Sequence, residues 1–423
     1  MNNLRRIWKT SDLRNSILFV IAMLVAFRVC AHVPIPGVDV KNLKAFFDSN
    51  QILGLLNVFS GGSMDKFSII TLGVGPYITS SIIFQLLAMI IPKLEEMQRE
   101  GGAGQQTINQ YTRICTVPLA MLQGYGMLTL LRQSAAGIVG ELTTLDYVVA
   151  LVAMTAGTIL LMWIGELISE KKIGNGISIL IFASIVSRLP SLVQQALVSY
   201  DSTMLFTWVA FVAIGVVTVA GVVMITEAQR NIPVVYAKRM RGAKLFGGVQ
   251  TSLPLRVNMA GVIPIIFAIS IVLFPPMIAQ FFLKAKTAWI AAGAQHVITF
   301  FQNNLIYGIL YFILVFVFTY FYTAVVFHPD QVAENMQKNG GFIPGVRPGR
   351  PTAEYIMKTL NRITPAGAMF LSVIAVLPLA VSKMTGSQSM VVGGTSLLIV
   401  VSVAIEIVNQ VNSQLTMREY EAM

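Results

Sequence analysis

The side chains best suited to bind a partner are basic ones in two long polar stretches between apolar segments. Residues 227–256 hold six basic residues against one Glu, and Val234 to Tyr236 alternate as in a short hairpin strand. Residues 328–362 hold a helix-like segment and then a turn rich in Gly and Pro that presents Arg347 and Arg350. Because arginine can bind carboxylate or phosphate in a fixed fork, these stretches predict a docking surface. Contact with anionic lipid is the alternative.

No catalytic arrangement accompanies the basic stretches. His32, His296 and His328 are dispersed, and the sequence has no His and Glu metal spacing, no Walker loop and no Gly-x-Ser-x-Gly turn. Cys30 and Cys115 are the only cysteines and are expected near opposite membrane faces, which excludes a disulfide framework. We therefore expect no enzyme activity, no cofactor and no metal site, and any energy must come from a partner or the membrane potential.

The chain that positions these residues is strongly apolar. Of its 423 residues, 55% are hydrophobic and 12% charged, with a mean hydropathy of +0.72, far from the balance of soluble domains. Ten apolar runs long enough to span a bilayer predict an all-α polytopic membrane protein. They cover about 16–33, 73–92, 113–132, 146–166, 174–192, 206–226, 257–276, 305–327, 363–382 and 391–412. The first is expected to be a retained span and not a cleaved signal peptide.

The charges predict how the spans are oriented. If the N-terminus lies inside, most Lys and Arg residues fall on inner segments, so both termini are expected in the cytoplasm. Ten spans divide into two sets of five with opposite orientations, which permits an inverted repeat with halves at 1–192 and 193–423. Arg28 and Glu406 are the clearest ionisable groups within spans, and we interpret them as structural. The absence of an acidic relay argues against an ion-coupled transporter.

The stretch from Asn57 to Pro92 consists of two unlike pieces. Gly73 to Ile91 is uncharged, and its length as a helix, ~28 Å, just suffices for one span. The preceding piece carries glycines, an Asp and a Lys, so it is too polar to face lipid and is expected inside a cavity of the helical bundle. An ordinary surface loop is the alternative. Small residues such as Gly174, Gly176 and Ser178 are expected to let the surrounding helices approach closely.

Eight ordered motifs along nearly the whole chain resemble the SecY family, whose members are central subunits of the bacterial protein-conducting channel. They are PIPG (34–37), NVFSGG (57–62), GPYITSSIIFQLL (75–87), INQYTR (108–113), GNGISILIF (174–182), LPLRVNMAGVIP (253–264), GGFIPGVRPG (340–349) and GGTSLLIVV (393–401). The resemblance implies an hourglass of ten helices in two inverted halves, hinged between the fifth and sixth spans. Such a channel opens across the membrane and sideways into lipid.

The resemblance also implies roles for individual residues. An apolar ring at the waist falls on Val74, Ile78, Ile177, Ile181, Ile266 and Ile399. A plug within about 52–70 includes Asn57, Phe59, Ser60, Gly61 and Gly62. Thr79, Gln85 and Asn258 match polar positions of a lateral gate, where they are expected to hydrogen-bond while the gate is closed; ordinary bonding between helices is the alternative.

The basic stretches match the family's docking sites, with Lys244 in the first, and Arg347 and the neighbouring Arg350 in the second. The implied partners are the motor ATPase SecA, the ribosome, the small subunits SecE and SecG, signal peptides, nascent chains and lipid. Gln105 and Gln106 depart from positions that are often basic in the family, and Lys172 stands where Gly is common. The expected function is passive transport of unfolded secretory polypeptides across the bacterial cytoplasmic membrane and lateral insertion of transmembrane helices.

Two other functions compete with this one. A secondary transporter for a small solute also uses inverted repeats and broken helices, but it needs a solvated polar site at the midplane, where the alignment puts an apolar ring. A scaffold or insertase that only shields helices would share the lateral seam and would need no central pore.

Overall fold

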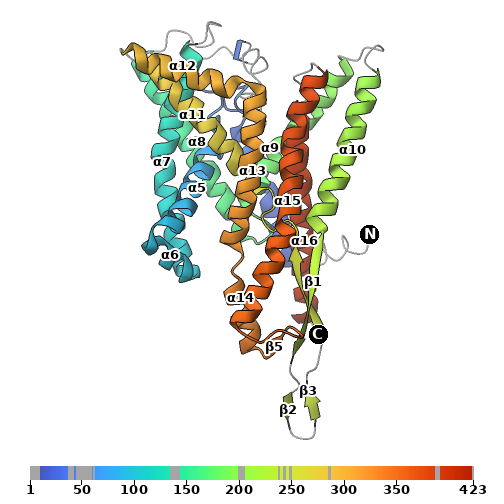
Figure 1. The fold of residues 1–423 in the computed structure, drawn as a ribbon. Coiled ribbons are helices and arrows are strands. Elements are labelled where there is room, and N and C mark those ends of the chain that lie inside the picture. The colour runs from blue at the N-terminus through green and yellow to red at the C-terminus, as the bar shows by residue number, and fades with distance from the viewer. Residues whose placement is uncertain are drawn as a thin grey trace.

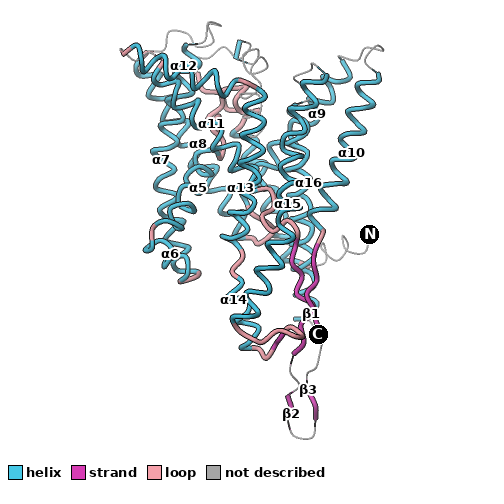
Figure 2. The backbone as a smooth tube through the Cα atoms, in the orientation of Figure 1, coloured by secondary structure: helices cyan, strands magenta, loops and turns pink. Residues whose placement is uncertain are grey.

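The computed structural model describes residues 10–36, 42–43, 60, 62–133, 143–198, 205–236, 239–241, 244–246, 250–283, 287–385 and 391–421. The helices lie side by side in one bundle, with the strands gathered at one end and α12 at the other (Figures 1 and 2). The helices are α2 (Ser11–Cys30), α5 (Gly75–Ile90), α6 (Pro92–Arg99), α7 (Gly102–Gln133), α8 (Thr144–Glu170), α9 (Gly176–Val198), α10 (Leu205–Glu227), α11 (Ile263–Phe282), α12 (Ala288–Gln302), α13 (Asn304–Val326), α14 (Pro329–Lys338), α15 (Arg350–Thr385) and α16 (Val391–Glu421).

Each of the ten predicted apolar runs overlaps one helix, although α11 begins only at Ile263 and α5 has 16 residues. Among the described residues, six helices are long and apolar enough to cross a membrane, and the α5–α6 pair, bent by 107°, counts as a seventh if it is one span. The apolar stretches of α9, α10 and α11 are shorter. The protein is thus a multi-pass helical membrane protein, while the number of ten spans stays a prediction. Cys30 and Cys115 are both free, as expected.

The helices pack closely where small residues face one another. A Cβ at Gly176 would overlap the carbonyl oxygen of Gly165 on the neighbouring helix α8. Ser169 braces the same crossing, because its Oγ donates to the Gly165 carbonyl oxygen and accepts from the Gly176 amide, both at 2.9 Å. The predicted close approach at Gly176 is therefore confirmed, and a side chain there has no room.

The polar piece before α5 is buried within the bundle and is not a surface loop. Residues 62–74 form successive turns, and the Phe67 side chain, 1% exposed, packs among Met127 and Leu128 of α7 and Met154 of α8. Phe67 has φ 47°, a left-handed conformation that is unusual for a bulky residue. Two backbone hydrogen bonds, Ile35 N to Phe67 O at 2.8 Å and Ile69 N to Val33 O at 3.0 Å, tie the piece to the end of α2. The described part of the piece is therefore largely buried in the bundle, as its polarity predicted, with Lys66 exposed.

A small sheet joins the two basic stretches. It contains β1 (Gln229–Tyr236), β4 (Gln250–Arg256) and β5 (Gly341–Phe342) in the antiparallel order β4-β1-β5. The strand predicted around Val234 is thus confirmed as part of β1. Beyond this sheet, β2 (Arg239–Arg241) pairs with β3 (Lys244–Phe246) to form the tip. An apolar cluster that includes Ile232, Leu255, Met336 and Ile356 fills the space between β1, β4, α14 and α15.

Candidate functional site

The residues assigned to the apolar ring come from four helices that belong to both predicted halves. Val74 precedes α5 as its N-cap and Ile78 follows one turn later; Ile177 and Ile181 lie on α9, Ile266 on α11 and Ile399 on α16. All but Ile177 are buried members of one apolar cluster, and Ile177 packs against it. Ile181 and Ile399 are 2% and 0% exposed. The structure thus places all six residues in or against one large apolar cluster, where Ile177 lies against Gly165 of α8, and their arrangement as a ring stays a prediction.

Only part of the expected plug can be located. Asn57, Phe59 and Gly61 lie outside the described residues. Ser60 is buried, and its Cα would lie 3.7 Å from a Cβ placed on Gly73. Gly62 has φ +76°, a conformation that side-chain-bearing residues rarely adopt. These two residues therefore begin the same buried segment that leads into α5 and the apolar ring.

The expected gate residues lie on both sides of the contact between α5 and α11. Thr79 and Gln85 are on α5, and Asn258 is in the loop that leads into α11. The Thr79 hydroxyl donates to Gly75 O at 3.0 Å, the Gln85 amide to Ser81 Oγ at 3.1 Å, and the Asn258 amide to Gly261 O at 3.2 Å.

These bonds are local, so the expected hydrogen bonding across the seam is not found among the described residues. Instead, the buried amide oxygens Gln85 Oε1 and Asn258 Oδ1 have no hydrogen-bond partner within the described part of the chain. A buried acceptor without a donor costs ~1–3 kcal/mol. None of these three side chains bonds across the seam within the described part of the chain, so separating its two sides breaks none of the three bonds.

The basic docking residues lie at the strand end of the bundle. Lys244 begins β3 at the tip. Arg347 is exposed in a turn between Gly345 and Gly349, whose φ angles are +81° and +94°, and its carbonyl oxygen accepts from the Thr352 hydroxyl at 2.8 Å. Arg350 opens α15, with its side chain 90% exposed and 3.7 Å from Glu354. The rigid turn thus presents one arginine to solvent, while the other has a weak partner on its own helix.

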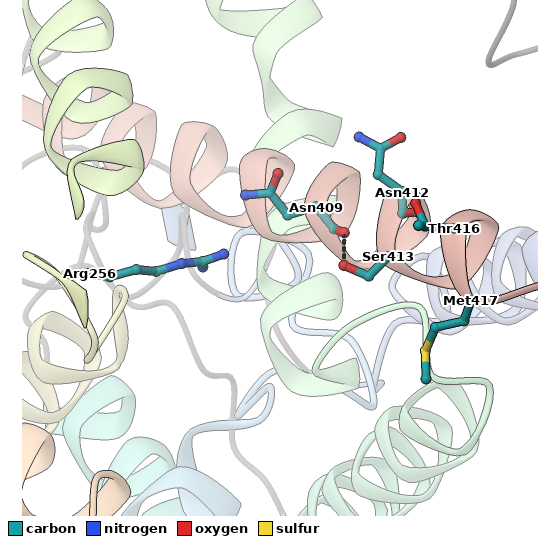
Figure 3. A pocket seen from close by; sticks show the side chains of 6 residues that line it. All are labelled: Arg256, Asn409, Asn412, Ser413, Thr416 and Met417. Atoms are coloured by element: carbon teal, nitrogen blue, oxygen red, sulfur yellow. Dashed lines mark hydrogen bonds between the residues drawn. The ribbon is translucent and has the colours of Figure 1, made fainter. Parts of the chain in front are cut away.

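Sequence reasoning missed a polar cavity beside this end of the bundle. Figure 3 shows Arg256, the last residue of β4, with its side chain directed toward Asn409 of α16. The two border an open pocket of about 490 Å³. The residues that line it are Arg256, Asn409, Asn412, Ser413, Thr416 and Met417. The i, i+3, i+4 and i+7 spacing of the polar residues on α16 was the available signal.

Sequence reasoning also missed an ion pair between the buried segment and α9. Arg188 Nη2 lies 3.2 Å from Asp65 Oδ2. Nothing in their spacing of 123 positions indicated a contact.

Comparisons with known proteins agree with this arrangement. The fold matches a solved structure of SecY with a TM-score of 0.61 at 16% identity, over 93% of this chain and 91% of that one. That structure is described as showing that the plug domain of SecY stabilises the closed state of the translocation channel and maintains a membrane seal. Sec61 in the canine ribosome–channel complex from the endoplasmic reticulum matches over the same shares with a TM-score of 0.57 and 16% identity. The chain thus has the fold shared by the SecY and Sec61 channel structures.

The family follows from the sequence comparisons. The SecY family profile matches residues 68–408. The protein translocase subunit SecY of Streptomyces galbus is 45% identical over 98% of this chain and 98% of its own length. The chain therefore belongs to the SecY family. Its function is that of a channel subunit in protein translocation, and transport of a small solute is not supported.

Proposed function

We propose that the chain forms an hourglass channel of ten spans in two inverted halves, 1–192 and 193–423, in the bacterial cytoplasmic membrane with both termini in the cytoplasm. It conducts unfolded secretory polypeptides across the membrane and releases hydrophobic helices sideways into lipid. The observation that carries this proposal is the apolar cluster in which α5 and α9 of one half meet α11 and α16 of the other.

The physical properties of this cluster suit a passive seal. Aliphatic side chains offer no fixed partner to an ion and disfavour a continuous column of water. They also form no directional bond that a passing polypeptide would have to break. Small rigid-body movements of the two halves widen such a ring, because its members come from both.

The gate residues support a lateral exit between α5 and α11. The hydrogen bonds of Thr79, Gln85 and Asn258 remain intact when the helices separate, because each bond lies within one side of the seam. Opening also lets water, lipid headgroups or a polar client group reach the two unpaired amide oxygens. Hydrating the two amide oxygens removes the free-energy cost of burying them without partners. This gain offsets part of the apolar packing energy that is lost when the seam opens.

The energy for transport comes from partners that bind the basic end of the bundle. The exposed Arg347 suits carboxylates of the motor ATPase SecA or phosphates of ribosomal RNA, and Lys244 at the tip adds a point charge. Arg350 contributes positive charge beside Arg347. SecE and SecG complete the membrane complex, and signal peptides and nascent chains are the clients.

The proposal is tested by crosslinking a stalled secretory chain to single cysteines at Ile78, Ile181, Ile266 and Ile399, with Cys30 and Cys115 replaced. One translocating segment should crosslink to all four positions, because they surround its path. Val216 on α10, whose side chain is 63% exposed on the outside of the bundle, is the matched control and should not crosslink. Transport without crosslinks at the four positions would contradict the ring.

A further inference from the structure

An ion pair holds the buried segment before α5 against helix α9. Arg188 Nη2 lies 3.2 Å from Asp65 Oδ2, and the two side chains are only 18% and 14% exposed. A partly buried pair of this kind is screened less than a surface pair, and it is costly to disrupt by removing one partner. The pair joins α9 to the segment that the channel must displace when it opens.

Arg188 also packs on the backbone of the same segment. Its Cδ would lie 3.7 Å, and its Nε 3.8 Å, from a Cβ placed on Gly62. The arginine side chain therefore covers Gly62 while its guanidinium reaches Asp65, three residues further along. One residue of α9 thus contacts both ends of the stretch 62–65.

The charges around the pair make Asp65 its critical member. Arg28 of α2 lies close enough to both Arg188 and Lys66 for electrostatic repulsion. Burial lowers the pKa of Lys66, Arg28 lowers it further, and Asp65 opposes this shift. Asp65 therefore lies among three cationic side chains of the described structure, and neutralising it leaves them to repel one another.

We propose that Arg188 is a positioning residue for the closed channel, because its ion pair with Asp65 latches residues 62–66 to α9 and must separate before this stretch leaves its closed position. The latch rests on the proposed function, in which this stretch belongs to the plug. It acts on the equilibrium between closed and open channels and does not contact the translocating chain in the closed state.

The experiment compares resting ion conductance in planar bilayers for the full-length chain, purified with the subunits that accompany it. Asp65→Asn should raise the open fraction about tenfold, between the effects typical of exposed and buried pairs. Arg188→Gln should raise it less, because this change also removes a cation that repels Arg28. The charge swap, which combines Asp65→Arg with Arg188→Asp, restores an ion pair and should leak less than Asp65→Asn or Arg188→Gln.

Two controls separate the latch from general destabilisation. Arg113→Gln breaks another ion pair in the same half, Arg113 Nε to Glu166 Oε1 at 2.6 Å between α7 and α8, and should leave conductance unchanged. Arg188→Lys retains a charge near Asp65 and should leak less than Asp65→Asn. If Arg188→Gln or the charge-swapped variant does not accumulate in the membrane, the comparison of Arg188→Lys with Asp65→Asn still tests the latch.

Wild-type conductance in Asp65→Asn would overturn the latch. The latch would also be overturned if the charge-swapped variant leaked as much as the leakier of Asp65→Asn and Arg188→Gln. The same holds if Arg188→Lys leaked as much as Asp65→Asn. Transport of a secretory precursor by the wild-type chain is measured in parallel. Its absence would overturn the proposed function, whereas normal transport together with wild-type leak in every variant would overturn only the latch.

Discussion

Replacing Gly176 by Ala should open the apolar ring by displacing α9. A Cβ at this position would overlap the Gly165 carbonyl oxygen and lie 2.7 Å from the Gly165 carbonyl carbon. Two non-bonded carbon atoms need ~3.5 Å, so the carbon contact alone requires the helices α8 and α9 to separate by roughly 0.8 Å, and the closer carbonyl oxygen requires more. Ile177 is the next residue, and Ile181 lies one turn further on, so the ring moves with the helix.

The cost of this change has two opposing parts. Overpacking of a tight contact typically costs ~1–3 kcal/mol, while alanine gains up to ~1 kcal/mol over glycine as a helix former. The net expectation is a destabilisation of about 1–2 kcal/mol. A radial gap of 0.5–1 Å forfeits a quarter to a half of the attraction between packed atoms, so the packing of Ile177 against Gly165 at the α8–α9 crossing should weaken appreciably.

Two measurements check this expectation. Thermal unfolding in detergent can be followed with a thiol-reactive dye, since Cys30 and Cys115 are both only partly exposed, and Tm should fall. Resting ion leak in proteoliposomes should rise. The matched control is Gly293→Ala in α12, where a Cβ would have no neighbour within 4 Å and where Tm should stay or rise. Unchanged Tm and leak in Gly176→Ala would refute the reasoning.

Three further outcomes are expected. Ile181→Ser combined with Ile399→Ser should raise ion leak, because two buried members of the ring become polar; Val216→Ser on the exposed face of α10 is the control, and equal leak in the two proteins would refute the assignment. Arg347→Glu should impair translocation while the chain still accumulates in the membrane, because the change reverses the charge of an exposed cation at the docking surface. Normal translocation would indicate that this surface contacts lipid and does not bind a partner. Lys172→Gly should raise the unfolding free energy by ~1 kcal/mol, because Lys172 has φ 57°, and a lower Tm would contradict this.

The sequence was sufficient to predict the long helices and the buried polar segment. Hydropathy over a span-length window identifies helices such as α13, because lipid exposure leaves few polar positions along them. The piece from Asn57 to Ile70 was predicted to lie in a cavity because its charges and glycines do not suit lipid. The departure at Lys172 also has a structural counterpart, since a left-handed residue stands where the family commonly has Gly.

Other features depend on distances that no local pattern encodes. Helix α12 escaped prediction because its 15 residues are too few for a span. The bend between α5 and α6 occurs at Ile91 and Pro92, the last two residues of the predicted run 73–92, and the run itself does not give its angle. The pair between Asp65 and Arg188 depends on how segments distant in sequence pack, so a single sequence does not indicate it.

The sheet β4-β1-β5 connects the proposed docking surface to three helices of the bundle. β1 follows α10 after a single residue, β4 leads through a short loop to α11, and β5 leads through the Arg347 turn to α15. Hydrogen bonds between antiparallel strands resist sliding, so β1, β4 and β5 are expected to move together as one rigid unit. A force applied to β1 or β4 would therefore reach both α10 and α11, and α11 carries Ile266, a residue of the proposed ring. Under the proposed function, a partner bound at this sheet would act on the seal without contacting it.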